Sequence, residues 1–325
     1  MSVNARELSA QTQARLIQLM RRHLAFHLVS WLIALITVSA LFSLAFFWPP
    51  SLLLAGGLSL FFFELLAYAI LSFNLVEQRK AQLVEIGQSF RDQIDQLYRS
   101  FPDHAAKSGS QMQDLAHQLH DVHWRLIPQW NRGGYLRDLA MRLSAWWHAV
   151  DTRALREWLL LNSAEYQMKG VRTSPLDIDS HAQLAMICID LADLWIPRDP
   201  KGEECLAKAA RVSMFLQVAL EELIILSEIA PPTPELYQKM ASCHCRLGDK
   251  EKQAENFQLA LALDPERIDL RLQLGQLYFA LGQQRKGLQV VAHLKERGDQ
   301  RGEDLLQHYG AQRVFSLDTQ LDLSR

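Results

Sequence analysis

The sequence predicts an all-α protein that combines an apolar two-helix hairpin, a long connecting helix and a helical part ending in repeats. Glycine and proline are scarce, with 15 and 11 in 325 residues, which favours long helices. Two long apolar runs lie near the N-terminus, and a 34-residue pattern recurs near the C-terminus. The 34 basic and 36 acidic side chains nearly balance, so no global attraction to nucleic acid or to anionic lipid is expected.

The first apolar run covers residues 24–48 and contains no charged side chain. A helix of this length rises about 37 Å, enough to cross the core of a bilayer. Pro49 and Pro50 end it, and the second run, residues 51–76, carries one charge, Glu64. Because the connection is short, the runs are expected to form an antiparallel transmembrane hairpin. A cleaved signal peptide fits less well, since the first run is too long and lacks a clear cleavage site.

Basic residues flank the hairpin on its two outer sides, whereas the turn between the runs has none. They are Arg6, Arg15, Arg21 and Arg22 before the first run, and Arg79, Lys80, Arg91 and Arg99 after the second. The positive-inside rule therefore places the N-terminal segment, residues 1–23, and the C-terminal domain in the cytoplasm. The sequence predicts an integral membrane protein with two spans.

Glu64 lies about midway through the second run, and a carboxylate at that depth is costly enough to be a candidate functional residue. The hairpin places it opposite residues 35–39, where Thr37 or Ser39 could form a hydrogen bond with it. One interpretation is a protonated carboxyl that links helices within or between protomers. The other is a proton or ion relay, which is disfavoured because no second ionisable group lies at the same depth.

After Val76 apolar residues recur in steps of three and four, which predicts an amphipathic stalk helix over residues 77–102. This stripe suits either packing against the chain's own domain or self-association. Residues 107–110, Lys-Ser-Gly-Ser, are expected to form a linker. Residues 103–179 form a helical, tryptophan-rich region, and its segment 135–150 is expected to join an aromatic core rather than lie on a membrane.

The clearest signal is the 34-residue repeat, with one unit at residues 234–267 and the next starting at Ile268. The matches at this offset are Met240-Ala241 with Leu274-Gly275, His244 with Tyr278, Gly248 with Gly282, and Phe257 with Val291. This pattern resembles the tetratricopeptide repeat (TPR) family, whose period is 34 residues. Two departures are His244, where an aromatic residue or leucine is usual, and Gln253, where a small residue is usual.

The resemblance is specific over residues 234–296 and degenerate over residues 180–233. It implies that residues 180–325 form a TPR-like α-solenoid, with the tail at 312–325 capping the last repeat, and that stacked units present a concave groove for a protein or peptide. The residues that the resemblance places in this groove are Glu235, Gln238, Ser242, Cys245, Arg246, Asp269, Leu272, Gln276 and Phe279.

Two groups of side chains could suggest a metal site, but their helical spacing argues against it. Cys243 and Cys245 of the Cys243-His244-Cys245 triplet are alternate residues, so their thiols diverge around a helix. The outer members of His117, His120 and His123 diverge in the same way. The sequence contains no Walker A loop and no GxGxxG, HExxH or GxSxG motif. We therefore expect no metal, no cofactor and no enzymatic activity.

These features predict a membrane-anchored TPR adaptor or scaffold that binds a partner protein on the cytoplasmic face, where anchoring raises the partner's effective concentration. Homo-oligomers are compatible with this prediction, and nucleic acid is not an expected partner. One alternative is an oligomeric membrane-shaping or channel-associated subunit that depends on Glu64. Another is a secreted effector inserted into a foreign membrane, because the short-turn hairpin is similar to the bilobed segment of chlamydial inclusion-membrane proteins.

Overall fold

The computed structural model describes residues 4–44, 50–101, 103–120, 134–196, 203–307 and 309, and every regular element in these ranges is a helix. The all-α prediction is therefore confirmed for the described part of the chain. The chain divides into two compact units, Met1–Lys169 and Gly170–Arg325, which are described separately.

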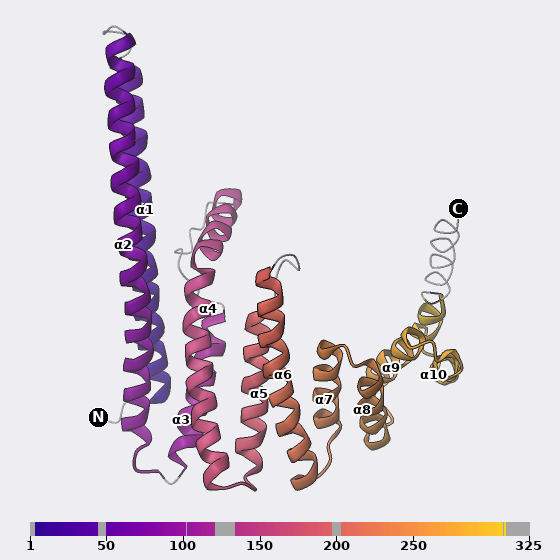
Figure 1. Ribbon diagram of the computed structural model, residues 1–325. Helices are drawn as coiled ribbons and strands as arrows, with labels where there is room; N and C mark the ends of the chain where they lie inside the picture. The colour runs from indigo at the N-terminus through magenta and orange to yellow at the C-terminus, as the bar shows by residue number, and fades with distance from the viewer. Residues whose placement is uncertain are drawn as a thin grey trace. The chain divides into compact units, whose positions relative to one another are not determined.

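Two long antiparallel helices, α1 (Ala5–Leu44) and α2 (Pro50–Tyr98), pack along each other in the first unit (Figure 1). Pro50 begins α2, a position where its missing N–H leaves no hydrogen bond unmade. The second apolar run continues into the expected stalk as one uninterrupted helix of 49 residues, which ends at Tyr98 rather than at residue 102. Both helices are long and apolar enough to cross a membrane, judged by length and composition.

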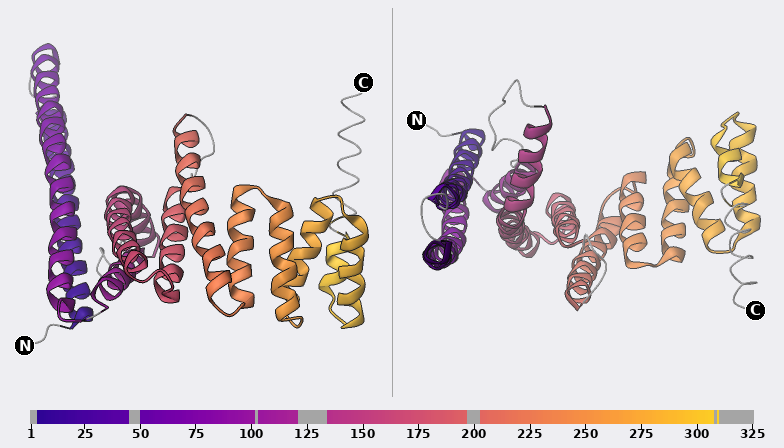
Figure 2. Two further views of the ribbon diagram at one scale, coloured as in Figure 1. Left: turned by 60° about the horizontal axis from the view of Figure 1, so that its bottom comes forward. Right: turned by 90° about the horizontal axis from the view of Figure 1, so that it is seen from above.

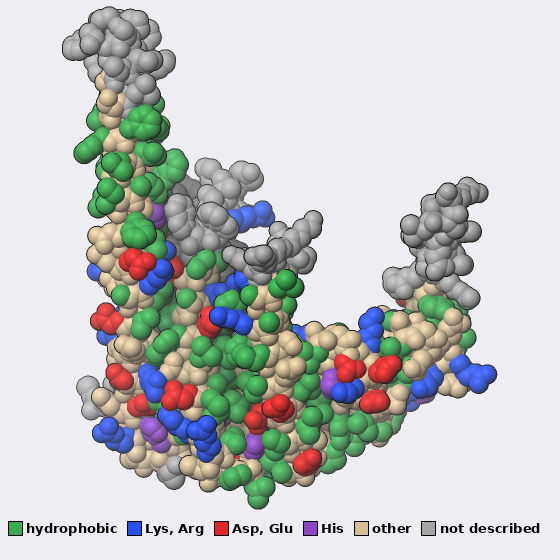
Figure 3. Space-filling model, in the orientation of Figure 1, with side chains coloured by type: hydrophobic (Ala, Val, Ile, Leu, Met, Phe, Trp, Pro, Cys, Tyr) green, Lys and Arg blue, Asp and Glu red, His purple; other side chains and the backbone are tan. Residues whose placement is uncertain are grey.

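The apolar runs of α1 and α2 face outward, so they do not form a conventional core. Many of their large side chains are exposed, and hydrophobic side chains project from the coloured upper part of the hairpin in the space-filling view (Figure 3). Those that are at least 61% exposed include Leu28, Trp31, Leu35, Phe62, Phe63 and Phe73. Outside the runs the pattern reverses, because Leu16 on α1 and Phe90 and Ile94 on α2 are almost completely buried. The stripe after Val76 therefore packs within its own unit.

The first unit also contains α3 (His104–Gln118) and most of α4 (Gly134–Thr173). The prediction of a linker at residues 107–110 is wrong, because these residues lie inside α3 and Gly109 is buried. The Ser163 hydroxyl of α4 donates to the Gly109 carbonyl at 2.7 Å, and a Cβ at Gly109 would lie 2.7 Å from Gln167 Nε2. The small residues thus serve close helix packing rather than chain flexibility.

The side chains between residues 121 and 148, apart from Arg142, lie outside the described residues, so the expected aromatic core there stays a prediction. His123 falls in the same range. His117 lies on α3, and His120 follows that helix with its Nδ1 3.2 Å from the Arg156 guanidinium.

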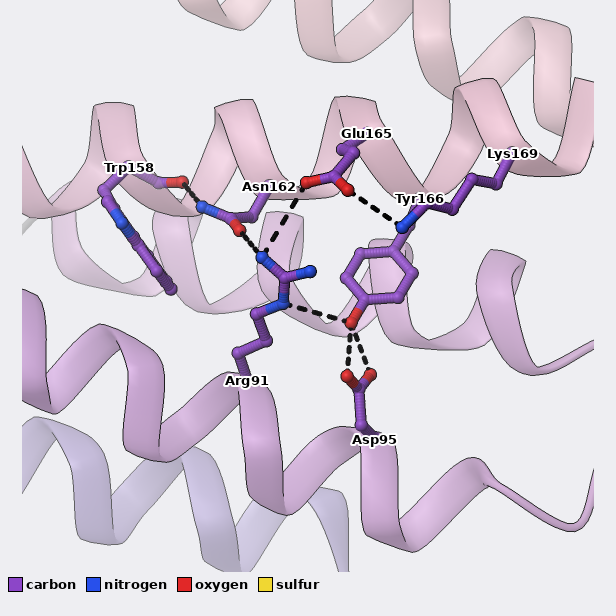
Figure 4. A network of polar contacts seen from close by, with 7 residues as sticks. All are labelled: Arg91, Asp95, Trp158, Asn162, Glu165, Tyr166 and Lys169. Carbon is purple, nitrogen blue, oxygen red and sulfur yellow. Dashed lines mark hydrogen bonds and ion pairs between the residues drawn. The ribbon is translucent and has the colours of Figure 1, made fainter.

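A polar network joins the half of α2 beyond the apolar run to α4 (Figure 4). The Tyr166 hydroxyl donates to Asp95, and the Arg91 guanidinium donates to Tyr166 and, at 2.5 Å, to Asn162 Oδ1. Glu165 lies 3.7 Å from Arg91. Burial, together with the hydrogen bond to Asp95, raises the pKa of Tyr166 to about 12, so its hydroxyl remains a donor at neutral pH.

The second unit is a row of helices in which each packs on the next (Figure 2). They are α5 (Ile178–Trp195), α6 (Glu203–Ile229), α7 (Pro234–Leu247), α8 (Lys250–Leu263), α9 (Ile268–Ala280) and α10 (Gln284–Glu296), followed by a helical segment at residues 301–307. Residues 312–325, the expected cap, lie outside the described residues. In α6, Ala219, Leu223 and Leu226 are buried, as the degenerate upstream pattern predicts.

Local signals set the helix ends in the repeats. Thr233 caps α7 by accepting the Leu236 N–H, and Pro234 occupies the first turn, where proline is favoured. Gly248 ends α7 with a positive φ of 82°, and Gly282 repeats this conformation 34 residues later with a φ of 72°. Glycine adopts this left-handed conformation without a Cβ clash. The two glycines therefore place the same turn at the same position in both repeats.

The core of the repeats combines small and large side chains at the positions that the period predicts. Ala241 and Ala260 are fully buried and allow the helices to approach, and Phe257, Leu274 and Tyr278 fill the remaining space. Neither helix pair could bury these residues alone, so the two adjacent repeats, α7–α8 and α9–α10, stabilise each other.

His181 is a buried titratable group that should make the second unit sensitive to pH. Its Nδ1 lies 2.5 Å from Glu222 Oε2 and its Nε2 lies 3.0 Å from the Pro175 carbonyl, so both nitrogens face acceptors. Burial acts to lower the pKa of His181, but the bonds to Glu222 and Pro175, with the charges of Glu222 and Asp177, leave it raised. A raised pKa stabilises the fold fully below the unfolded value, about 6.5, and this contribution disappears as pH rises through the folded value.

We therefore expect the second unit to be less stable at pH 9 than at pH 6, and the His181→Gln variant to show a smaller difference. Hydrogen exchange of α5 and α6 amides in the full chain at both pH values, corrected for intrinsic exchange, measures this. An equal pH dependence in parent and variant would assign it to other groups.

Candidate functional site

A groove of about 860 Å³ lies on the repeat helices of the second unit. Its lining comes from α7, from α9 and the turn before it, and from the start of the segment at 301–307; it includes Gln238, Arg267, Asp269, Leu272, Gln276 and Arg301. A second hollow of about 370 Å³ shares Leu272, Gln276 and Arg301 with it and extends to Leu305. The combined surface offers amide groups, paired charges and one apolar strip.

Two arginine–carboxylate pairs recur in this groove with the period of the repeat. Arg267 pairs with Glu235 at 2.8 Å, and Arg301 pairs with Asp269 at 2.6 Å, so both partners shift by 34 residues. Arg267 also donates to Gln238 Oε1 at 3.0 Å. The hydrogen bonds of Arg301 with Asp299 and Asp269 raise its pKa, so the charge is permanent at physiological pH.

Sequence reasoning missed the two arginines, although their 34-residue spacing is visible in the sequence. The resemblance supplies groove positions only from the first helix of each unit. Arg267 is instead the last residue of the repeat at 234–267, and Arg301 is the last residue of the next repeat. Each arginine reaches back to the acid at the second position of its own repeat, Glu235 or Asp269.

Four of the nine predicted groove residues line the groove together: Gln238, Asp269, Leu272 and Gln276. Glu235 reaches its edge through its pair with Arg267. Ser242 and Cys245 are exposed on α7 and do not line the groove, and Arg246 pairs with Asp193 of α5 at 2.9 Å.

Phe279 differs from the expectation, because its side chain is buried, with only 8% exposed. Its ring stacks on Tyr309 with centroids 4.2 Å apart, and a Cβ at Gly287 would lie 2.6 Å from the ring. The absence of a side chain at Gly287 leaves space that Phe279 fills. The ring therefore stabilises the last helices instead of facing the groove.

The buried cysteines act as apolar core residues. Burial raises the pKa of Cys188 to about 12 and that of Cys243 to about 11, so both thiols are protonated and weakly reactive at neutral pH. Within the described residues no three His, Cys, Asp or Glu side chains are arranged to hold a metal ion.

Glu64, the second candidate site, has a partner on the facing helix. Thr37 Oγ1 lies 2.5 Å from Glu64 Oε1 and also donates to the Ile33 carbonyl at 3.0 Å. The expected contact with Thr37 is confirmed. A protonated Glu64 can donate to the Thr37 oxygen while the Thr37 hydroxyl donates to Ile33, which gives both hydroxyl protons an acceptor. His27 instead lies 3.0 Å from the Tyr68 hydroxyl.

No known protein-family model matches the sequence, and no curated protein matches it significantly. Among solved structures the chain is similar to a thermophilic TPR protein of Thermus thermophilus, at 18% identity and a TM-score of 0.32. That match covers 63% of this chain and 99% of the other. A second is the assembly chaperone of RpL4, Acl4, at 14% identity and a TM-score of 0.30, covering 77% of this chain and 98% of the other.

The helix pairs themselves define a TPR-like repeat region. The left-handed Gly248 and Gly282, the buried small residues Ala241 and Gly275, and the arginine–carboxylate pairs of Arg267 and Arg301 all follow the period of 34 residues. Residues 234–301 thus form a TPR-like helical repeat structure.

Proposed function

We propose that this protein is a membrane-anchored adaptor that binds a segment of a partner protein in the groove of its repeats. The observation that carries the proposal is the groove itself. Two successive repeats contribute Gln238, Leu272 and Gln276, which present amides and an apolar side chain to the same space. Amides can bond to the backbone of an extended peptide, and the apolar strip can take up a side chain.

The hairpin of α1 and α2 supports the anchoring part of the proposal. Large side chains such as Trp31 and Phe73 are exposed along both helices, an arrangement that is unfavourable in water and favourable in lipid. The flanking arginines support an orientation with residues 1–23 and the repeats in the cytoplasm. Because Thr37 of the same hairpin contacts Glu64, the carboxyl needs no second protomer, and an anchor is favoured over a channel.

The test uses the full chain reconstituted in lipid nanodiscs as bait in a lysate of the producing organism. A groove variant carries Gln238→Ala, Leu272→Ala and Gln276→Ala. A matched control carries Gln284→Ala, Leu288→Ala and Gln289→Ala, which change the same residue types at exposed positions of α10. We expect the parent and the control to retain a partner that the groove variant loses. Equal retention by all three would place the binding surface elsewhere.

Replacing Thr37 with valine is expected to destabilise the hairpin by about 0.6 to 2 kcal/mol, because Glu64 loses its hydrogen-bond partner in an apolar environment. Ser43→Ala is the matched control, since Ser43 bonds to the Ser39 carbonyl of its own helix. Unfolding of the purified chain in mixed detergent with increasing SDS gives the difference. If the two variants unfold alike, Glu64 does not depend on Thr37.

A further inference from the structure

We propose that a groove between α1 and α2 binds the phosphate of an anionic phospholipid headgroup. This inference rests on the membrane anchoring proposed above. The groove has a volume of about 340 Å³ and lies just beyond the apolar runs of both helices. Arg15, Gln18 and Arg22 line it from α1, and Gln82, Glu85 and Ser89 line it from α2.

The two arginines are arranged to bind one ligand. Arg15, Gln18 and Arg22 are separated by three and four residues, so they share one face of α1. Arg15 Nη1 donates to Ser89 Oγ at 3.3 Å, which places a hydroxyl beside the guanidinium. Guanidinium, amide and hydroxyl groups together provide the donors that phosphate oxygens accept.

Arg15 and Arg22 also differ from the arginines of α2 in their charge partners. Arg79 pairs with Asp151, and Arg91 lies 3.7 Å from Glu165. Within the described residues, neither Arg15 nor Arg22 forms an ion pair with a carboxylate. Their charges thus remain available to an anion, which an arginine can bind through two parallel hydrogen bonds.

The groove lies at the depth where lipid headgroups are found. Arg22 is two residues before Leu24, where the apolar run begins, and Arg15 lies about 10 Å further along α1. On α2 the lining residues begin six positions after Val76. The headgroup layer is about 5 to 8 Å thick on each side, so the half of the groove nearer the apolar runs opens into it.

The charges of the groove favour a singly charged phosphate. Two arginines and Glu85 leave one net positive charge in the lining. The buried Leu19 and the half-buried Ile86 supply apolar surface beside it, suited to the glycerol end of a phospholipid. The ligand class is therefore an anionic phospholipid such as phosphatidylglycerol rather than a soluble polyanion.

The test measures lipid binding to the full chain by native mass spectrometry, with phosphatidylglycerol and phosphatidylcholine as the two probes. We expect the parent to prefer phosphatidylglycerol. Arg15→Gln and Arg22→Gln should each lower that affinity about fivefold, and together about 25-fold. Glu85→Gln should raise it. Lys80→Gln is the control, because Lys80 lies outside the groove and its charge already pairs with Glu77 at 3.0 Å, so we expect the affinity to change less than about twofold.

Two further experiments distinguish a failure of the proposed membrane anchoring from a failure of the proposed headgroup site. Flotation of the parent with phosphatidylcholine vesicles tests anchoring alone, and a chain that stays in solution overturns both proposals. If it floats but shows no preference for phosphatidylglycerol, or if Lys80→Gln weakens binding as much as Arg22→Gln does, only the headgroup site is overturned. Displacement of phosphatidylglycerol by millimolar inorganic phosphate would mean that free phosphate is the occupant.

Discussion

Replacing Phe257 with alanine is expected to lower the free energy of unfolding of the repeat region by about 3 to 5 kcal/mol. The Phe257 side chain is only 4% exposed and packs in the cluster of Ala241, Leu274 and Tyr278 that joins the two repeats. Its removal leaves a cavity where the helix pairs meet. Hydrogen exchange of the full chain should show the most protected amides of α7 and α9 exchanging about a hundredfold faster or more.

Leu259→Ala is the matched control for this prediction, because Leu259 lies on the same helix and is 48% exposed. We expect its effect to stay below about 1 kcal/mol. Equal effects of the two variants would mean that the repeats are not held together by this cluster. If α7 and α8 lose protection against hydrogen exchange while α9 keeps it, the two repeats unfold independently.

Replacing Arg79 with methionine is expected to destabilise the first unit by about 3 to 5 kcal/mol. Arg79 of α2 pairs with Asp151 of α4 at 3.0 Å, and their side chains are only 13% and 7% exposed. Methionine keeps much of the volume but removes the positive charge that Arg79 places 3.0 Å from the buried carboxylate. Faster hydrogen exchange of α4 amides between residues 151 and 167 would measure the loss.

The double variant Arg79→Met/Asp151→Asn tests the physical cause. Removing both charges should restore part of the lost stability, since a buried carboxylate that has lost the charge of Arg79 costs more than the attraction of the pair contributes. A double variant at least as unstable as the single one would show that the two side chains matter for packing instead.

The helices were predictable because their signals are local. The apolar runs, the caps at Thr233 and Gly248, and the period of 34 residues are all visible in short stretches of sequence. The prediction of a linker around Gly109 was wrong, because small residues are equally suited to a flexible loop and to close packing between helices. Only the position of α4 across from α3 distinguishes the two.

The candidate groove was predictable in part, for the same reason. Gln238 and Gln276 stand at positions that the resemblance to TPR units places in the groove, and both line it. Phe279 stands at such a position too, but its ring fills the space above Gly287, a contact that no linear pattern contains. Arg267 and Arg301 lie at the ends of units, so their approach to the groove depends on how each side chain folds back.

The unbroken course of α2 has a mechanical consequence. From Val76 to Tyr98 the helix continues for 22 residues beyond the apolar run, a lever arm of about 33 Å. Rotating the apolar portion by about 10°, within the range over which spans tilt in bilayers of different thickness, would displace the far end by about 6 Å. Arg91 and Asp95 connect this arm to Tyr166 of α4, so α4 would move with it. With the membrane anchoring proposed above, bilayer thickness would become a variable that sets the position of these helices.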